Sequence, residues 1–193
     1  MPIRKLQGRL CIVRLEITAA EIPSRLTGHA RRYPGAGDLE TAGRSLAAGG
    51  FAPAACADFV RRVCKWGGGY RQLDRVRDNN APAEVSAALR EGVVLARSDQ
   101  VAEAVERIRL LRNLGQSFAS KQLRFLEPTR AVILDSVIRT QLGYAETAIG
   151  YEEFLTDCQT ILSDVTATSD MQGAGLRVCD IEAAIYAKLK GIE

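Results

Sequence analysis

The sequence predicts a mainly α globule with little strand. Apolar residues recur at intervals of three and four along most of the chain, which is the spacing of one face of a helix. Glycine and proline stand between these repeats, where they end one helix and begin the next. The chain has 193 residues, of which 47 % are hydrophobic and 25 % charged, so it can bury a core without a disulfide or a metal.

The first 50 residues are predicted to form a segment that packs on a helical domain at 51–193. Residues 13–17 alternate between apolar and charged side chains, which is typical of a short strand. Thr18 and Glu21 have the spacing of a capping box and equally favour a helix start, which Pro23 would soon interrupt. Residues 27–37 are rich in Gly, Arg and Pro and are predicted to be a loop.

About eight helices are predicted beyond this loop, with one or two further helical turns at residues 70–77. Each is bounded by a breaker or a capping residue. Residues 131–134 are predicted to be extended, and Asp135 is predicted to cap the helix that follows them. The eight helices are expected at residues 38–48, 53–66, 82–90, 99–114, 118–126, 135–142, 151–162 and 177–190.

Charge and cysteine usage limit the possible functions. The net charge of +3 permits an anionic partner without requiring one. The five cysteines are odd in number and contain no CxxC, which favours reduced thiols and predicts no metal or cofactor. There is no signal peptide pattern and no apolar run of about 20 residues, so a cytoplasmic protein is predicted. The single histidine, His29, is expected to be a solvated loop residue, against a small chance that it serves a Ser-His-Asp or Cys-His site.

One lysine and one aspartate form a candidate pair for amine chemistry. Lys121 lies near the start of the helix at 118–126, between Phe118 and Phe125 on one face. Burial and the positive helix end both disfavour the ammonium form, and a nucleophilic lysine needs a pKa of about 7–8 rather than about 10.4. Asp135, as an N-cap, would stay ionised beside it. On spacing alone, a solvated lysine and an ordinary helix cap explain the same residues.

A cationic segment precedes this pair. Trp66 and Tyr70 bracket the run Gly67–Gly69, and packing in the core is the ordinary explanation for Trp66. The cations favour phosphate contacts or, equally, form a solvated helix face. Asp74 is the one carboxylate among six cations, namely Arg61, Arg62, Lys65, Arg71, Arg75 and Arg77.

The stretch LRNLGQSFASKQLRFLEPTRAVILDSVIRTQLG, residues 111–143, resembles the central segment of the helix-hairpin-helix DNA glycosylase superfamily that contains endonuclease III and 8-oxoguanine DNA glycosylase. It is most similar to the bacterial branch with an 8-oxoguanine glycosylase-like fold, where S-K begins the second hairpin helix and an apolar run leads to D-S. Those positions are Ser120-Lys121 and Asp135-Ser136 here. The resemblance implies that Lys121 is the nucleophile and that Asp135 assists departure of the base.

The resemblance also implies contacts with double-stranded DNA that carries a modified base. The family's usual hairpin, L-P-G-x-G, binds a DNA phosphate through its backbone amides. The corresponding hairpin is assigned here to residues 114–118, which contain one glycine and no proline. The lysine–aspartate separation is shorter than in the better known members, and the family's iron–sulfur cysteine cluster is absent. Trp66 and Tyr70 become candidates for stacking on an extruded base or for wedging into the duplex. Gln116, Phe118 and Phe125 are further candidates for base contact or for the wedge. The candidates for backbone contact are Arg62, Lys65, Arg71, Gly115 and Ser117.

These observations predict a DNA glycosylase of base-excision repair, with AP lyase activity. The alternative is a non-catalytic nucleic-acid-binding or defence-associated module that keeps the glycosylase-like fold, and the altered hairpin favours it. A purely structural helical protein is a third, weaker alternative. The glycosylase would bind DNA and react through Lys121. The binding module would bind DNA without that reaction, and the structural protein would not bind DNA.

Overall fold

The computed structural model describes residues 3–6, 9–12, 15–168 and 173–193. Its mainly α architecture confirms the predicted fold class. Within the described residues there are ten α-helices: α1 Ile22–Arg32, α2 Ala36–Ala48, α3 Pro53–Trp66, α4 Tyr70–Asn79, α5 Pro82–Arg97, α6 Val101–Arg109, α7 Gln116–Leu126, α8 Ser136–Leu142, α9 Ala148–Thr166 and α10 Val178–Leu189.

A small antiparallel sheet precedes the helices. Its strands are β1 (Ile3–Leu6), β2 (Arg9–Ile12) and β3 (Leu15–Ile17), hydrogen-bonded in the order β1-β2-β3. The strand predicted at residues 13–17 is confirmed over β3, and its first two residues lie outside the described part of the chain. The capping box also forms, because the Glu21 carboxylate accepts from the Thr18 backbone N–H at 2.9 Å.

The predicted loop at residues 27–37 is wrong. Pro23 lies in the first turn of α1, where a missing N–H costs nothing, so the helix continues to Arg32. Gly28 lies inside α1 and not in a turn. Its missing side chain lets Glu193 pack closely against the helix, because a Cβ there would lie 2.7 Å from the Glu193 carbonyl carbon. Only a short turn at residues 33–35 separates α1 from α2, and Gly35 adopts φ +88° in it.

Two predicted helix ends also change. The helix predicted to end at Arg90 continues through Gly92, where a Cβ would meet Ile108 Cδ1 at 2.9 Å, so this glycine permits the close approach of α6. The helix predicted at 99–114 ends at Arg109 instead. Its later apolar residues belong to a connection in which Asn113 is left-handed, with φ +68°.

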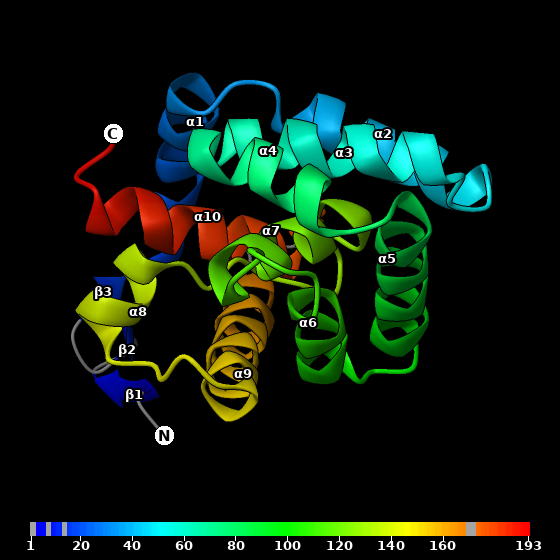
Figure 1. Ribbon diagram of the computed structural model, residues 1–193. Helices are drawn as coiled ribbons and strands as arrows, with labels where there is room; N and C mark the ends of the chain where they lie inside the picture. Colours follow the sequence, from blue (N-terminus) through cyan, green and yellow to red (C-terminus); the bar gives the residue numbers. More distant parts are fainter. Residues whose placement is uncertain (1–2, 7–8, 13–14, 169–172) are drawn as a thin grey trace.

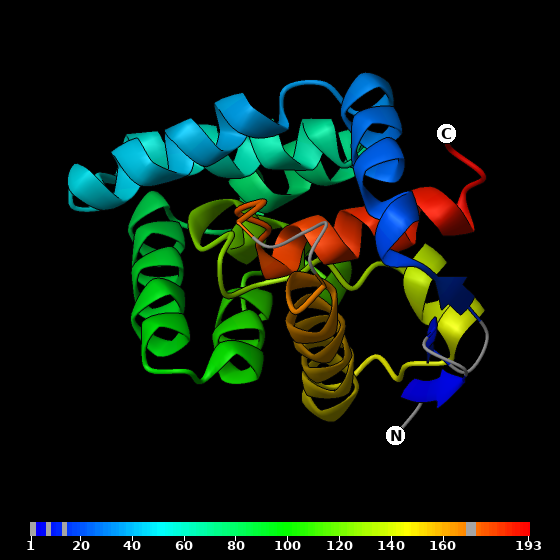
Figure 2. The same cartoon turned by 180° about the vertical axis from the view of Figure 1, so that it is seen from behind.

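The helices enclose α7. In Figure 1, α1 to α4 lie along one side, α7 and α10 run through the middle, and α5, α6 and α9 lie on the other side. The reverse view shows the same order (Figure 2). Nine of the eleven residues of α7 are buried, so this helix is central to the core. In addition, α1 packs against α10 and α2 against α7, which brings residues before position 50 onto the body of the fold.

The four cysteines whose side chains are described, Cys56, Cys64, Cys158 and Cys179, are buried and form no disulfide. This agrees with the predicted reduced thiols. Among the described helices, none combines the length and apolar character needed to cross a membrane.

Candidate active site

Lys121 and Asp135 face the same cavity. The Lys121 Nζ lies 3.8 Å from Asp135 Oδ2 and donates to Ser117 Oγ at 2.9 Å. Both side chains are largely buried, with 8 % and 13 % of their surfaces exposed. The cavity they line has a volume of about 180 Å³. The two residues singled out in the sequence therefore meet in space at a site of roughly nucleobase size.

Hydrogen bonds hold Asp135 in register with Lys121. Ser120, the residue before the lysine, accepts from the Leu134 backbone N–H at 3.3 Å. The Tyr151 hydroxyl donates to the Val132 carbonyl at 3.0 Å and accepts from the Val132 N–H at 3.2 Å. The chain at 131–134 is thereby fixed alongside α7.

Asp135 then caps α8, as predicted. Its Oδ1 accepts from the backbone N–H groups of Val137 at 3.0 Å and Ile138 at 3.1 Å. Oδ2 is left to face the lysine. One carboxylate thus has two roles, because one oxygen fixes the helix and the other is directed at the amine.

The glycine run permits the end of α3 to approach α7 closely. Gly68 adopts φ +75°, which favours glycine. A Cβ on Gly67 would lie 2.9 Å from Lys121 Cδ, and one on Gly69 would lie 2.4 Å from Phe118 Cζ. Gly68 therefore forms the turn, and Gly67 lets the end of α3 contact the lysine side chain closely.

Burial lowers the pKa of Lys121, because a desolvated ammonium loses its hydration. The negative charge of Asp135 acts in the opposite direction. The Nζ also lies 5.2 Å from the centroid of the Phe118 ring. The lysine is thus poised to release its proton more readily than a free lysine does.

Glu182 was not predicted from the sequence. It extends from α10 to the cavity wall, and 3 % of its surface is exposed. Burial raises its pKa to about 8, against a lowering by Arg124, so the carboxyl keeps its proton at neutral pH. Its only signal in the sequence is an acidic residue between the apolar Ile181 and Ala183 of the last helix.

An aromatic wall completes the cavity and was also missed. His29 and Tyr33 come from α1 and the turn after it, and Tyr186 comes from α10. The Tyr33 ring lies 5.0 Å from His29 and 5.6 Å from Tyr186, and the two tyrosine hydroxyls are 3.2 Å apart. Burial, with a contribution from Arg124, lowers the pKa of His29 to about 4. The expected solvated loop histidine is wrong, since His29 is a neutral, largely enclosed residue of a helix.

The other aromatic candidates occupy different places. Trp66 lines the cavity and also packs edge-on against Phe125 at 4.8 Å, so both alternatives for Trp66 describe part of its environment. Phe125 is fully buried behind it and does not line the cavity. Phe118 is half-buried beneath the lysine. Tyr70 is 65 % exposed at the start of α4 and lies outside the cavity.

Gln116 and Ser117 stabilise the site from the first turn of α7. The Gln116 amide donates to the Thr147 carbonyl at 2.9 Å, and this residue is 1 % exposed and away from the cavity wall. Ser117 accepts from Lys121 Nζ. Both side chains are therefore engaged within the protein.

The connection between α6 and α7 lies three residues earlier than predicted. Residues 116–118 belong to α7, so the hairpin assigned to 114–118 is wrong. The pattern L-P-G-x-G fits Leu111–Gly115 instead, with Asn113 at φ +68° in place of the first glycine. Asn80 holds this turn by donating to the Arg112 carbonyl at 3.0 Å and accepting from its N–H at 2.8 Å. A Cβ at Gly115 would meet nothing within 4 Å, so this position is open.

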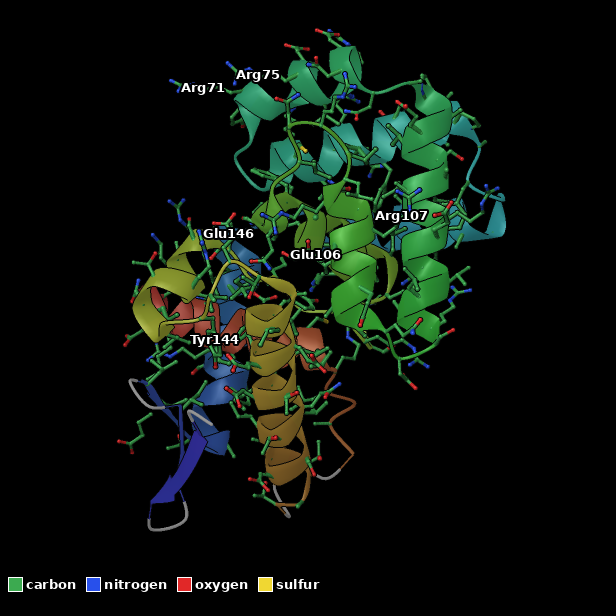
Figure 3. The ribbon with its side chains drawn as sticks, turned by 60° about the horizontal axis from the view of Figure 1, so that its bottom comes forward. Arg71, Arg75, Glu106, Arg107, Tyr144 and Glu146 are labelled. Carbon is green, nitrogen blue, oxygen red and sulfur yellow. The ribbon has the colours of Figure 1, made fainter. Side chains whose placement is uncertain are left out.

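The cationic candidates lie at the surface. Lys65 and Arg71 are exposed, and Arg62 is half-buried. Arg71 and Arg75 point outward from α4 in Figure 3. The hairpin is adjacent to this helix, because the Asn113 side chain donates to the Arg75 carbonyl at 3.3 Å. Helix α4, which carries Arg71, thus adjoins the hairpin.

Comparison with protein families gives one match. The family described as "Putative 8-oxoguanine DNA glycosylase OGG-like protein" matches residues 38–186, which is well over half of the chain. No curated protein and no solved structure matches the chain. The matched span contains Lys121, Asp135 and Glu182, and it excludes His29 and Tyr33.

Proposed function

The chain belongs to this OGG-like DNA glycosylase family, and on that premise we propose that it excises a modified base from double-stranded DNA through Lys121, with AP lyase activity. Family membership implies DNA as the substrate. The single observation that carries the catalytic proposal is the 3.8 Å approach of Lys121 Nζ to Asp135 Oδ2 at the wall of a base-sized cavity.

The reaction begins when the target nucleotide leaves the duplex and its base enters the cavity. Neutral Lys121 attacks C1′ of the sugar, and the C1′–N bond breaks with its electron pair going to the base. The Asp135 carboxylate stabilises the positive charge that develops on the sugar. The departing base takes up one proton, and the alkylated lysine nitrogen releases one.

The lyase step follows from the covalent bond. The C1′–nitrogen adduct opens the sugar ring and becomes a protonated Schiff base. This group withdraws electrons and acidifies the neighbouring C2′–H. Loss of that proton expels the 3′-phosphate and cuts the strand. Water then releases Lys121 from the product.

The DNA is proposed to lie over the hairpin and the start of α4. Gly115 is open, and it precedes the N-terminus of α7, whose unpaired N–H groups favour a phosphate. Arg71 supplies an exposed cation beside this hairpin, and Arg62 and Lys65 supply two more on α3. Trp66 is proposed to contact the extruded base, and exposed Tyr70 is proposed as the wedge that fills the gap in the duplex.

Borohydride reduction tests the catalytic proposal, because it traps a Schiff base permanently. We expect the wild-type protein to become covalently linked to at least one duplex from a panel of modified bases. Lys121→Gln should give no adduct, and Lys190→Gln, which changes an exposed lysine at the end of α10, should trap as the wild type does. An adduct that persists in Lys121→Gln would refute the assignment.

The hairpin favours a second candidate function. It lacks the proline and the first glycine of L-P-G-x-G, which suits a non-catalytic module that binds DNA with a buried, ion-paired lysine. Such a module would bind duplex DNA equally well with Lys121→Gln and would excise no base from the panel.

A further inference from the structure

A second, larger groove adjoins the catalytic cavity. It has a volume of about 670 Å³ and lies between the α1–α2 turn, the second half of α3 and the start of α4. Tyr33 and Trp66 line both this outer groove and the cavity, with their ring centroids 6.1 Å apart. The two rings therefore form the boundary between an open groove and the site that holds Lys121.

The outer groove is cationic. Arg32, Arg62 and Lys65 line it, and none of them is ion-paired with a carboxylate among the described residues. A fourth cation, Arg61, is paired with Asp58 at 2.6 Å and adds little. Asp38 is the one carboxylate on the described wall. An excess of unpaired positive charge in a groove favours a polyanion.

The groove also presents an aromatic surface to solvent. Tyr70 lines it with 65 % of its surface exposed, so packing does not explain this side chain. Exposed rings among cations are the arrangement by which proteins bind unpaired nucleotides, because bases stack on the ring while phosphates meet the cations. The groove thus carries both elements of nucleic-acid binding, at the opening of a cavity sized for one base.

We propose that the outer groove binds the sugar–phosphate backbone of the DNA strand that carries the extruded nucleotide, and that its base enters the cavity past the edge formed by Tyr33 and Trp66. This inference rests on the proposed function. It assigns a role to Arg32 and Tyr33, which precede the span matched by the family.

The first test measures salt dependence. A duplex with a tetrahydrofuran abasic analogue is titrated at 50 to 200 mM salt with the triple variant Arg32→Ala, Arg62→Ala, Lys65→Ala. The slope of log K against log salt should fall by roughly 2–3, because each lost phosphate contact removes about 0.9. The control triple variant Arg44→Ala, Arg90→Ala, Lys190→Ala removes the same charge from exposed positions outside the groove and should keep the wild-type slope.

The second test identifies the strand. Neutral methylphosphonate linkages are placed on either side of the abasic analogue, in the damaged strand or opposite it. The wild-type protein should lose affinity only when the methylphosphonates are in the damaged strand. The groove variant should show no further loss of affinity when that same strand is neutralised. Equal sensitivity to both strands, or an equal fall in slope for the control triple variant, would overturn the inference.

The groove and the catalytic site are tested separately. Groove variants should need a higher DNA concentration for half-maximal trapping, because the groove binds the backbone and does not react. If wild type traps but the groove variant keeps its slope, the groove inference alone fails. If wild type never traps while the slope changes as expected, the proposed glycosylase chemistry fails instead.

Discussion

At the scale of single residues, Asp135 tests the electrostatics of the site. Its charge raises the pKa of Lys121, whereas burial lowers it. Asp135→Asn keeps a good N-cap and removes the charge. We expect the maximal trapping rate to fall by about 10²–10³-fold, as for other lost transition-state charges. The acidic limb of the pH–rate profile should shift to lower pH, since the lysine becomes easier to deprotonate. An unmoved limb would contradict the coupling of the two groups.

Glu182 links stability to pH. Its pKa is raised to about 8 in the folded protein, so the folded chain keeps a proton that the unfolded chain has released. Stability should therefore fall as the pH rises from 6.5 to 8, by up to about 1.4 kcal/mol per pH unit. Glu182→Gln should flatten this dependence, measured by urea unfolding at both pH values. His29, with its lowered pKa, contributes below this range and equally in both proteins. Identical pH dependence in the two proteins would contradict a buried neutral carboxyl.

The sequence identifies the central pair but not its surroundings. Lys121 and Asp135 carry local signals, namely an S-K at a helix start and an N-cap before an apolar helix. His29 comes from α1 and Glu182 from α10, and the packing of α1 against α10 brings both to one cavity. Their positions depend on contacts between distant segments, which local spacing does not encode. Family resemblance did not supply His29 either, since it lies outside the matched span.

At the scale of elements, the glycine run places α3 against the lysine. Gly67→Ala would bring a Cβ to 2.9 Å from Lys121 Cδ, and the flexible lysine must move to relieve the contact. We expect trapping to slow by about 100-fold, because a misplacement of about 1 Å is enough. Stability should change by less than about 1 kcal/mol.

Gly37→Ala is the matched control, because its Cβ in the first turn of α2 would meet nothing within 4 Å. It should leave trapping unchanged and keep or raise stability by about 0.5–1 kcal/mol. Thermal unfolding and single-turnover trapping measure both variants. Normal trapping in Gly67→Ala would show that the close contact does not set the lysine position.

Helix identity was predictable, whereas helix ends were less so. Apolar periodicity located the main helices, and the Asp135 cap and the Gly143 stop of α8 are confirmed, with Gly143 at φ +86°. The errors fell on glycines that serve packing. Gly28 fell in the predicted loop and Gly92 beyond a predicted helix end, although each lies inside a helix and lets another segment approach it. The hairpin was misplaced for the opposite reason, because no glycine marks its turn. Asn113 adopts the left-handed conformation that glycine usually adopts there.

At the scale of the whole molecule, a buried ionic network joins three helices. Glu40 of α2 accepts from Arg124 of α7 at 2.7 Å and from Arg177, which precedes α10, also at 2.7 Å. Arg177 is further paired with Asp180 at 2.9 Å. No local pattern of residues indicates this network, since its members are separated by up to 137 residues. It connects the helix that carries Lys121 to the one that carries Glu182.

Removing the shared carboxylate should therefore loosen the whole fold. Glu40→Gln leaves Arg124, whose side chain is 7 % exposed, without its counter-charge, and we expect a loss of about 3–5 kcal/mol in the free energy of unfolding. Glu91→Gln breaks a pair of similar geometry with Arg107, but Glu91 is 50 % exposed, so the loss should be much smaller than for Glu40→Gln. Urea midpoints of the two variants decide the comparison. Equal losses in the free energy of unfolding would mean that burial does not make the Glu40 network more stabilising than an exposed ion pair. Apolar packing would then be the main interaction that holds α2, α7 and α10 together.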